Sequence, residues 1–277
     1  MISFQGVIYP AIVMGLLGLV FGALLAFASI KFFVKTDERV SLIREILPGA
    51  NCGGCGFPGC DGYAEGIVVE GAKTNLCAAG GSALAKGIAE IMGVESEESV
   101  PVRAFLRCYG SPENSARNAV YEGIQDCRSA AILPSGSPNA CPFGCMGFGT
   151  CVKVCVFGAL SIQDGLATVD PSKCVGCGTC VATCPKQVLA LVPRSANVQV
   201  FCSSRWRGPD VKRVCKVGCI GCTLCVKTCP ENAIAMENNV ARIDYKKCTN
   251  CGACVAKCPT KIIREIIPRQ QDERESA

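Results

Sequence analysis

The stretch CIGCTLCVKTCPENAIAMENNVARIDYKKCTNCGACVAKCP, residues 219–259, decides the fold of the C-terminal part of this chain. Each of its two ends carries three cysteines at intervals of three residues, followed by a fourth cysteine directly before a proline. Three thiolates in so tight a loop bind three corners of one [4Fe–4S] cubane, while the fourth ligates the cluster of a paired motif. The pattern therefore predicts two clusters with exchanged ligands. The expected ligand sets are Cys219, Cys222, Cys225 and Cys258 for one cluster, and Cys229, Cys248, Cys251 and Cys254 for the other.

The segment between the two motifs predicts a β-hairpin. Residues 233–244 alternate apolar and polar side chains around Asn238 and Asn239, a dipeptide that suits a tight turn. Motif, hairpin and motif together predict the βαββαβ plan of a small two-cluster ferredoxin.

An upstream copy of this arrangement has one ligand position altered. The motif CVGCGTCVATCP at residues 174–185 needs a partner, and the only candidate is ACPFGCMGFGTCVKVCVFGAL at residues 140–160. There the regular frame has Phe148 in place of a cysteine, with Cys141 just upstream. We expect Cys141 to replace the lost ligand; the alternative is a [3Fe–4S] or empty site with Cys141 as a free thiol. The expected sets are Cys155, Cys174, Cys177 and Cys180, and Cys141, Cys145, Cys151 and Cys184.

A separate cysteine motif lies nearer the N-terminus. The stretch NCGGCGFPGC at residues 51–60 is followed by a further cysteine after sixteen residues. Four thiolates suit a cubane or a tetrahedral zinc ion, and zinc usually takes two separated CxxC pairs. We therefore expect a [4Fe–4S] cluster, with short helices over residues 36–47 and 82–92 on either side. Its expected ligands are Cys52, Cys55, Cys60 and Cys77.

Four of the 24 cysteines remain outside these sets. Two precede the irregular unit and two follow it, so the ends of one compact unit bring them together. Several arginines lie near them in sequence, and cations favour thiolate over thiol. We predict a sixth cubane; the alternative is four buried thiols that pack as small apolar side chains. The expected ligands are Cys108, Cys127, Cys202 and Cys215.

The first 30 residues contain no charged side chain. Residues 7–30 are apolar enough to cross a bilayer as a helix about 36 Å long. A signal peptide is disfavoured, since no basic region precedes the apolar run. Lys31, Lys35 and Arg39 follow it, which predicts that the cluster domains face the cytoplasm from a single-pass anchor in the plasma membrane, the inner membrane of the cell. In that reducing compartment disulfides are disfavoured.

Composition excludes several classes of function. The chain has no histidine, which excludes histidine-ligated zinc or haem and any Ser-His or Cys-His catalytic device. No GxGxxG follows a predicted strand and no Walker loop is present, so we expect no direct NAD binding. The net charge of +5 comes with only 6% aromatic residues and no extended run in which they alternate with basic ones, and we expect no nucleic-acid binding. One-electron transfer within an assembly is the chemistry that remains.

With these motifs assembled, the chain resembles the B subunit of the Rnf complex, the membrane ferredoxin:NAD oxidoreductase that moves Na⁺ or H⁺. The resemblance covers nearly the whole chain and rests on the uncharged N-terminus, NCGGCGFPGC, the RCYG and DC segments at 107–110 and 126–127, and CPFGCMGFGTCVKVC at 141–155. It implies a chain of [4Fe–4S] clusters that accepts electrons from reduced ferredoxin and passes them to membrane subunits, with NAD⁺ reduced elsewhere in the complex. One departure is Val156, where the other motifs have proline.

The expected fold class is α+β, with one transmembrane helix, a small [4Fe–4S] domain and two ferredoxin-like two-cluster units. The expected divisions are 1–34 as anchor, 35–95 as [4Fe–4S] domain, 96–140 as connector, 141–205 as irregular unit, 206–262 as regular unit and 263–277 as polar tail. Two other functions remain open: a tethered polyferredoxin serving a hydrogenase or other reductase, and an iron–sulfur sensor or zinc-stapled scaffold.

Overall fold

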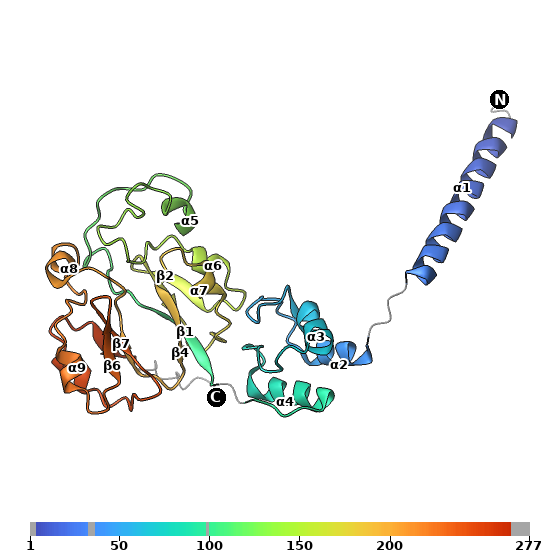
Figure 1. Cartoon of the computed structure of the whole chain (residues 1–277). Coiled ribbons are helices and arrows are strands. Elements are labelled where there is room, and N and C mark those ends of the chain that lie inside the picture. Colours follow the sequence, from blue (N-terminus) through green and yellow to red (C-terminus); the bar gives the residue numbers. More distant parts are fainter. Residues whose placement is uncertain (1–3, 33–36, 98–99, 267–277) are drawn as a thin grey trace, which may run out of the picture.

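The computed structural model describes residues 4–32, 37–97 and 100–266. The predicted anchor is helix α1, Phe4–Lys31, drawn in blue in Figure 1. Its segment Ile12–Lys31 has a mean hydropathy of 2.4, and none of it is buried against the rest of the chain. By length and composition this helix is a candidate membrane span.

Three helices build the N-terminal cluster domain, residues 37–97: α2, Glu38–Ile46, α3, Cys60–Val69, and α4, Gly81–Met92. Asp37 caps α2 by accepting a hydrogen bond from the backbone N–H of Arg39 at 2.9 Å, and Gly93 ends α4 in the left-handed conformation. Both helices predicted from the sequence are therefore present. Their apolar faces meet in a core that contains Ile43, Tyr63 and Ile88.

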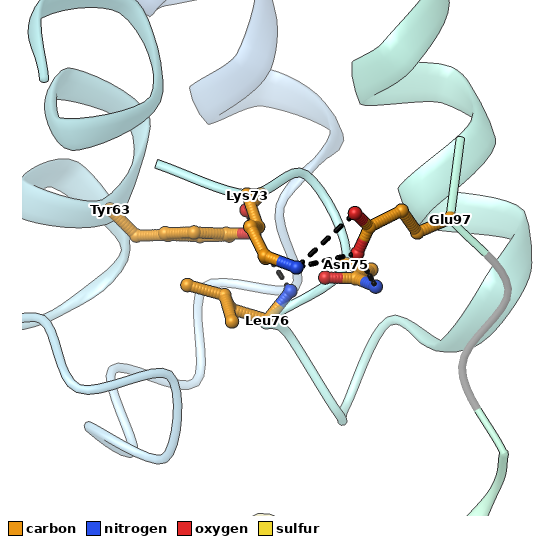
Figure 2. Close-up of polar contacts among 5 residues, drawn as sticks. All are labelled: Tyr63, Lys73, Asn75, Leu76 and Glu97. Atoms are coloured by element: carbon orange, nitrogen blue, oxygen red, sulfur yellow. Dashed lines mark hydrogen bonds and ion pairs between the residues drawn. The ribbon is translucent and has the colours of Figure 1, made fainter. Parts of the chain in front are cut away.

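A polar network holds the loop that leads to Cys77 (Figure 2). The Tyr63 hydroxyl donates to the carbonyl of Lys73 at 2.8 Å and accepts from the backbone N–H of Leu76 at 3.1 Å. The Lys73 ammonium pairs with Glu97 at 2.9 Å. This loop has no helix or strand of its own, so these contacts set its path.

Two βαββαβ units follow, which we call the first unit (residues 102–193) and the second unit (residues 198–265). The first unit consists of β1, Val102–Leu106, α6, Thr150–Lys153, β2, Leu160–Gln163, β3, Leu166–Val169, α7, Thr179–Thr183, and β4, Leu189–Pro193, with α5, Cys127–Ala130, in the long connection after β1. The second consists of β5, Val198–Val200, α8, Gly208–Val214, α9, Leu224–Thr228, β6, Ile234–Glu237, β7, Val240–Ile243, α10, Ala253–Lys257, and β8, Ile263–Glu265. In each unit the outer strands pair antiparallel, β1 with β4 and β5 with β8.

The inner strands of each unit form tight hairpins. The hairpin predicted at residues 238–239 joins β6 to β7, and both asparagines have positive φ, 47° and 66°. Asp164 and Gly165 occupy the same two positions between β2 and β3, with φ of 50° and 70°. Positive φ at both central residues is the signature of the type I′ turn.

The outer strands lie partly outside the ranges expected from the cysteine motifs. Strand β1 comes from the predicted connector, 96–140, and β5 lies inside the predicted irregular unit, 141–205. Strand β8 lies at the start of the predicted polar tail, 263–277. The motifs mark only the helices and hairpins, whereas a strand of three to five residues is defined by the strand with which it pairs.

The two units pack side by side (Figure 1). Phe201, just after β5, meets the ring of Phe105 of β1 edge-on, with centroids 4.8 Å apart. Arg264 of β8 lies 3.8 Å above the ring of Tyr109, and Arg103 donates to the carbonyl of Ala196 at 2.9 Å. These contacts join the two units through β1 and the segment after it on one side, and through β8 and the segments on either side of β5 on the other.

Candidate iron–sulfur sites

The second unit brings its eight motif cysteines into the two expected groups. Burial and the neighbouring thiols of Cys219, Cys222 and Cys258 raise the pKa of Cys225 to about 11. Burial and the thiols of Cys248, Cys229 and Cys251 raise the pKa of Cys254 to about 11 as well. The exchanged cysteine of each motif is found where the pattern predicts it: Cys258 beside Cys225, and Cys229 beside Cys254. The backbone N–H of Ala233 donates to the sulfur of Cys229 at 3.3 Å, which stabilises a thiolate there.

One group in the first unit also follows the sequence pattern, and we call it the regular site. Burial raises the pKa of Cys180 to about 12, with further effects from the thiols of Cys174, Cys177 and Cys155. The N–H of Ala104 in β1 donates to the Cys174 sulfur at 3.3 Å, so the outer strand contributes to the site.

The other group differs from the sequence expectation. We call it the irregular site; it is a cavity lined by Cys127, Cys145, Cys151 and Cys184. Cys127 supplies the fourth sulfur, and Cys141 does not. The pKa of Cys151 is raised to about 12 by burial and by the other three thiols of this group.

A polar link explains why Cys127 lies here. The side chain of Asp126 caps α5, accepting from the N–H of Arg128 at 2.8 Å, and it also accepts from the hydroxyl of Thr150 at 2.8 Å. The same hydroxyl accepts from the N–H of Cys127 at 2.6 Å. Thr150 directly precedes Cys151, so one buried side chain fastens the two cysteines together. Phe148 packs instead against Tyr121, with ring centroids 5.1 Å apart.

Cys141 belongs to a different group. It lines a cavity with Cys108, Cys202 and Cys215, which we call the junction site because it lies between the two units. The sequence placed Cys127 in this group and Cys141 in the irregular site, and the structure exchanges them. Spacing could not reveal this, because Cys127 lies 24 positions before Cys151 and outside any motif; the capping aspartate before it was the available signal.

The N-terminal site groups Cys52, Cys55, Cys60 and Cys77 as expected, around a cavity that Cys177 of the first unit also lines. The Thr179 hydroxyl donates to the carbonyl of Cys52 at 3.1 Å. A Cβ on Gly54 would lie 2.5 Å from the carbonyl oxygen of Cys177, so glycine permits this close approach. The N-terminal site and the regular site are therefore in direct contact.

The donor chemistry of these groups fits iron–sulfur clusters. Four sulfurs surround a cavity in the irregular site, as a cubane with one iron per thiolate requires. Among the described residues, no three cysteine or carboxylate side chains are arranged to hold a single metal ion. Burial alone favours neutral thiols, whereas bound iron deprotonates a thiol outright.

Comparison with known proteins agrees with this chemistry. The family described as "Putative Fe-S cluster" matches residues 47–79, "4Fe-4S binding domain" matches 166–189, and "4Fe-4S dicluster domain" matches 218–262. These matches place the chain among iron–sulfur proteins with ferredoxin-type domains.

Relatives along almost the whole chain define the family. The B subunit of the Na(+)-translocating ferredoxin:NAD(+) oxidoreductase complex of Acetobacterium woodii is 46% identical over 245 residues, covering 88% of this chain and 73% of the relative. The B subunit of the proton-translocating complex of Clostridium ljungdahlii is 44% identical over 98% of both chains. The B subunit of the ion-translocating oxidoreductase complex of Methanosarcina acetivorans is 45% identical over 89% of this chain and 94% of the relative. The chain belongs to the family of Rnf complex B subunits, as its motifs indicated.

Proposed function

We propose that this protein is the membrane-anchored electron-transfer subunit of an ion-translocating ferredoxin:NAD oxidoreductase, accepting electrons from reduced ferredoxin and passing them to membrane subunits. Bound cubanes supply one-electron transfer, and the chain supplies ligands, spacing and electrostatic tuning. The observation that carries the proposal is the direct contact between cysteine groups that are far apart in sequence.

Neighbouring cysteine groups are in contact at two places. Gly54 and Cys52 of the N-terminal site touch Cys177 and Thr179 of the regular site. Within the first unit, Cys151 of the irregular site lies near enough to Cys180 of the regular site for their thiols to interact. Neighbouring clusters held this closely suit a path for single electrons.

The ligands proposed here number twenty cysteines in five sets. They are Cys52, Cys55, Cys60 and Cys77; Cys155, Cys174, Cys177 and Cys180; Cys127, Cys145, Cys151 and Cys184; Cys219, Cys222, Cys225 and Cys258; and Cys229, Cys248, Cys251 and Cys254.

We further propose that the cluster domains face the cytoplasm. Lys31 closes α1, and Arg39 lies in the first turn of α2, so the flank on the cluster side is basic. Basic flanks stay in the cytoplasm. A reporter fused after Ala277 that is active only outside the cytoplasm would contradict this orientation.

The test of function uses the full chain, purified anaerobically in detergent. Reduced low-potential ferredoxin should bleach its iron–sulfur absorbance, while NAD⁺ added to the reduced subunit should yield no NADH until the other subunits are supplied. Protein stripped of iron by a chelator is the control. Rapid NADH formation by the isolated subunit, or bleaching by dithionite but not by ferredoxin, would contradict the proposal.

A further inference from the structure

We propose that Cys108, Cys141, Cys202 and Cys215 form a sixth [4Fe–4S] site that joins the two units. None of the matched iron–sulfur families covers any of these four residues. The inference deepens the proposed function, since it adds a site to the same set of clusters.

The junction site is built from equivalent positions of the two units. Cys108 lies two residues after β1, and Cys202 lies two residues after β5. Cys141 precedes the first motif cysteine of its unit, Cys145, by four residues. In the second unit Cys215 precedes Cys219 by the same four residues. Each unit therefore contributes one cysteine from its outer strand and one from the entrance to its motif.

Equivalent hydrogen bonds reach the two cysteines that follow the outer strands, Cys108 and Cys202. The backbone N–H of Cys145 donates to the Cys108 sulfur at 3.4 Å, and that of Cys219 donates to the Cys202 sulfur at 3.4 Å. Each of these donors is itself the first cysteine of a motif in its unit. The junction site is thus bonded to the irregular site on one side and to a second-unit site on the other.

Backbone N–H groups donate to two of the four sulfurs, one from each unit, those of Cys108 and Cys202. The Cys202 sulfur accepts a second such bond, from the backbone N–H of Ser204 at 3.5 Å. Hydrogen bonds to sulfur favour the thiolate, which is the form that ligates iron. Unrelated thiols that pack as small apolar side chains need no such set of donors.

A half-buried cation completes the surroundings. Arg107 lines the cavity, and its Nε is buried without a hydrogen-bond partner among the described residues. The other end of the guanidinium donates to the carbonyl of Gln187 at 2.9 Å. A buried charge is costly unless it is compensated, and a four-thiolate cluster carries the negative charge that compensates it.

The test replaces one cysteine from each unit in the full chain, Cys108→Ser and Cys215→Ser. Six cubanes correspond to about 24 iron atoms per chain, so each variant should hold about 20. Both should lose the same component of the reduced EPR spectrum, although the two residues lie far apart in sequence. Cys127→Ser is the matched control and should lose a different component, that of the irregular site.

The outcomes separate this inference from the proposed function, because iron content and EPR of dithionite-reduced protein involve neither ferredoxin nor NAD⁺. Iron unchanged in both variants would overturn the junction site, as would loss of different components. If a variant fails to fold, native mass spectrometry of the unmodified chain decides: a mass with six cubanes supports the site, and one with five overturns it.

Discussion

At the scale of single residues, the Thr150 hydroxyl links Asp126, Cys127 and the helix that carries Cys151. We expect Thr150→Val, which keeps the shape and removes the hydroxyl, to loosen Cys127 and to release iron from the irregular site first. The lost hydrogen bonds should lower the free energy of unfolding by about 1–3 kcal/mol. Chelator-induced iron loss and urea unfolding measure the two effects.

The control is Thr249→Val, because Thr249 also adjoins a motif cysteine, Cys248, but is exposed. It should behave as the unmodified protein does. Equal iron loss from the two variants would show that the Thr150 hydroxyl does not position Cys127.

Tyr63 is the residue on which the loop before Cys77 depends (Figure 2). Burial raises the pKa of Tyr63 to about 12, above the value near 10 of an unfolded chain. A raised folded-state pKa gives stability that is complete below pH 10 and is lost as the pH rises towards 12. Tyr63→Phe should destabilise the N-terminal domain by about 1–3 kcal/mol near neutral pH and remove its part of this alkaline loss.

Denaturant titrations at several pH values, following the absorbance of the N-terminal cluster, measure this effect. Tyr121→Phe is a control, since the ring of Tyr121 packs against Phe148 of the first unit and lies outside this domain. Identical pH profiles for the unmodified protein and Tyr63→Phe would contradict the assigned role.

At the scale of elements, the sequence predicted the local helices and hairpins around the repeated cysteine motifs. It did not predict which distant segments pair with one another. The hairpin at Asn238 and Asn239 and the helices flanking the N-terminal motif follow from local turn and capping chemistry, and all are present. The βαββαβ plan implied outer strands, but the positions of β1 and β5 were not predicted, because their partners β4 and β8 lie about 90 and 65 positions away. The sequence assigned Cys127 and Cys141 to each other's sites for the same reason, because contacts between distant segments decide where they lie. Cys127 is placed by its hydrogen bond to Thr150, a contact that no motif spacing encodes.

Helix α1 provides a prediction of its own. Deleting residues 1–31 should release the chain from membranes when its partner subunits are absent, since the apolar segment Ile12–Lys31 makes no buried contact with the rest of the chain. Iron content should stay at the level of the full chain. Membrane flotation and iron analysis measure the two quantities, and a truncated chain that still floats with lipid would contradict the anchor.

At the scale of the whole molecule, the structure gathers the 24 cysteines into six groups of four, and contacts join the N-terminal, regular, irregular and junction sites. The N-terminal site meets the regular site, the regular site meets the irregular site, and the junction site is bonded to both units. The cysteine motifs predicted four of these groups in full. The motifs did not predict the order of the groups in space, because that order is set by packing between segments that lie outside the motifs.

Gly54 tests whether that order matters. Gly54→Ala would place a Cβ 2.5 Å from the carbonyl oxygen of Cys177 and 2.8 Å from its Cβ, so the N-terminal domain must move away from the first unit. Overpacking of this kind costs about 1–3 kcal/mol. We expect unchanged iron content, a weaker magnetic interaction between the N-terminal cluster and its neighbour, and slower electron exchange between them. Pulsed EPR and rapid-freeze reduction measure these quantities.

Gly87→Ala is the control, since its Cβ would lie 3.5 Å from Ile46, an ordinary contact. Unaltered coupling and exchange in Gly54→Ala would mean that electrons do not cross at this contact, and the path would have to enter the first unit elsewhere.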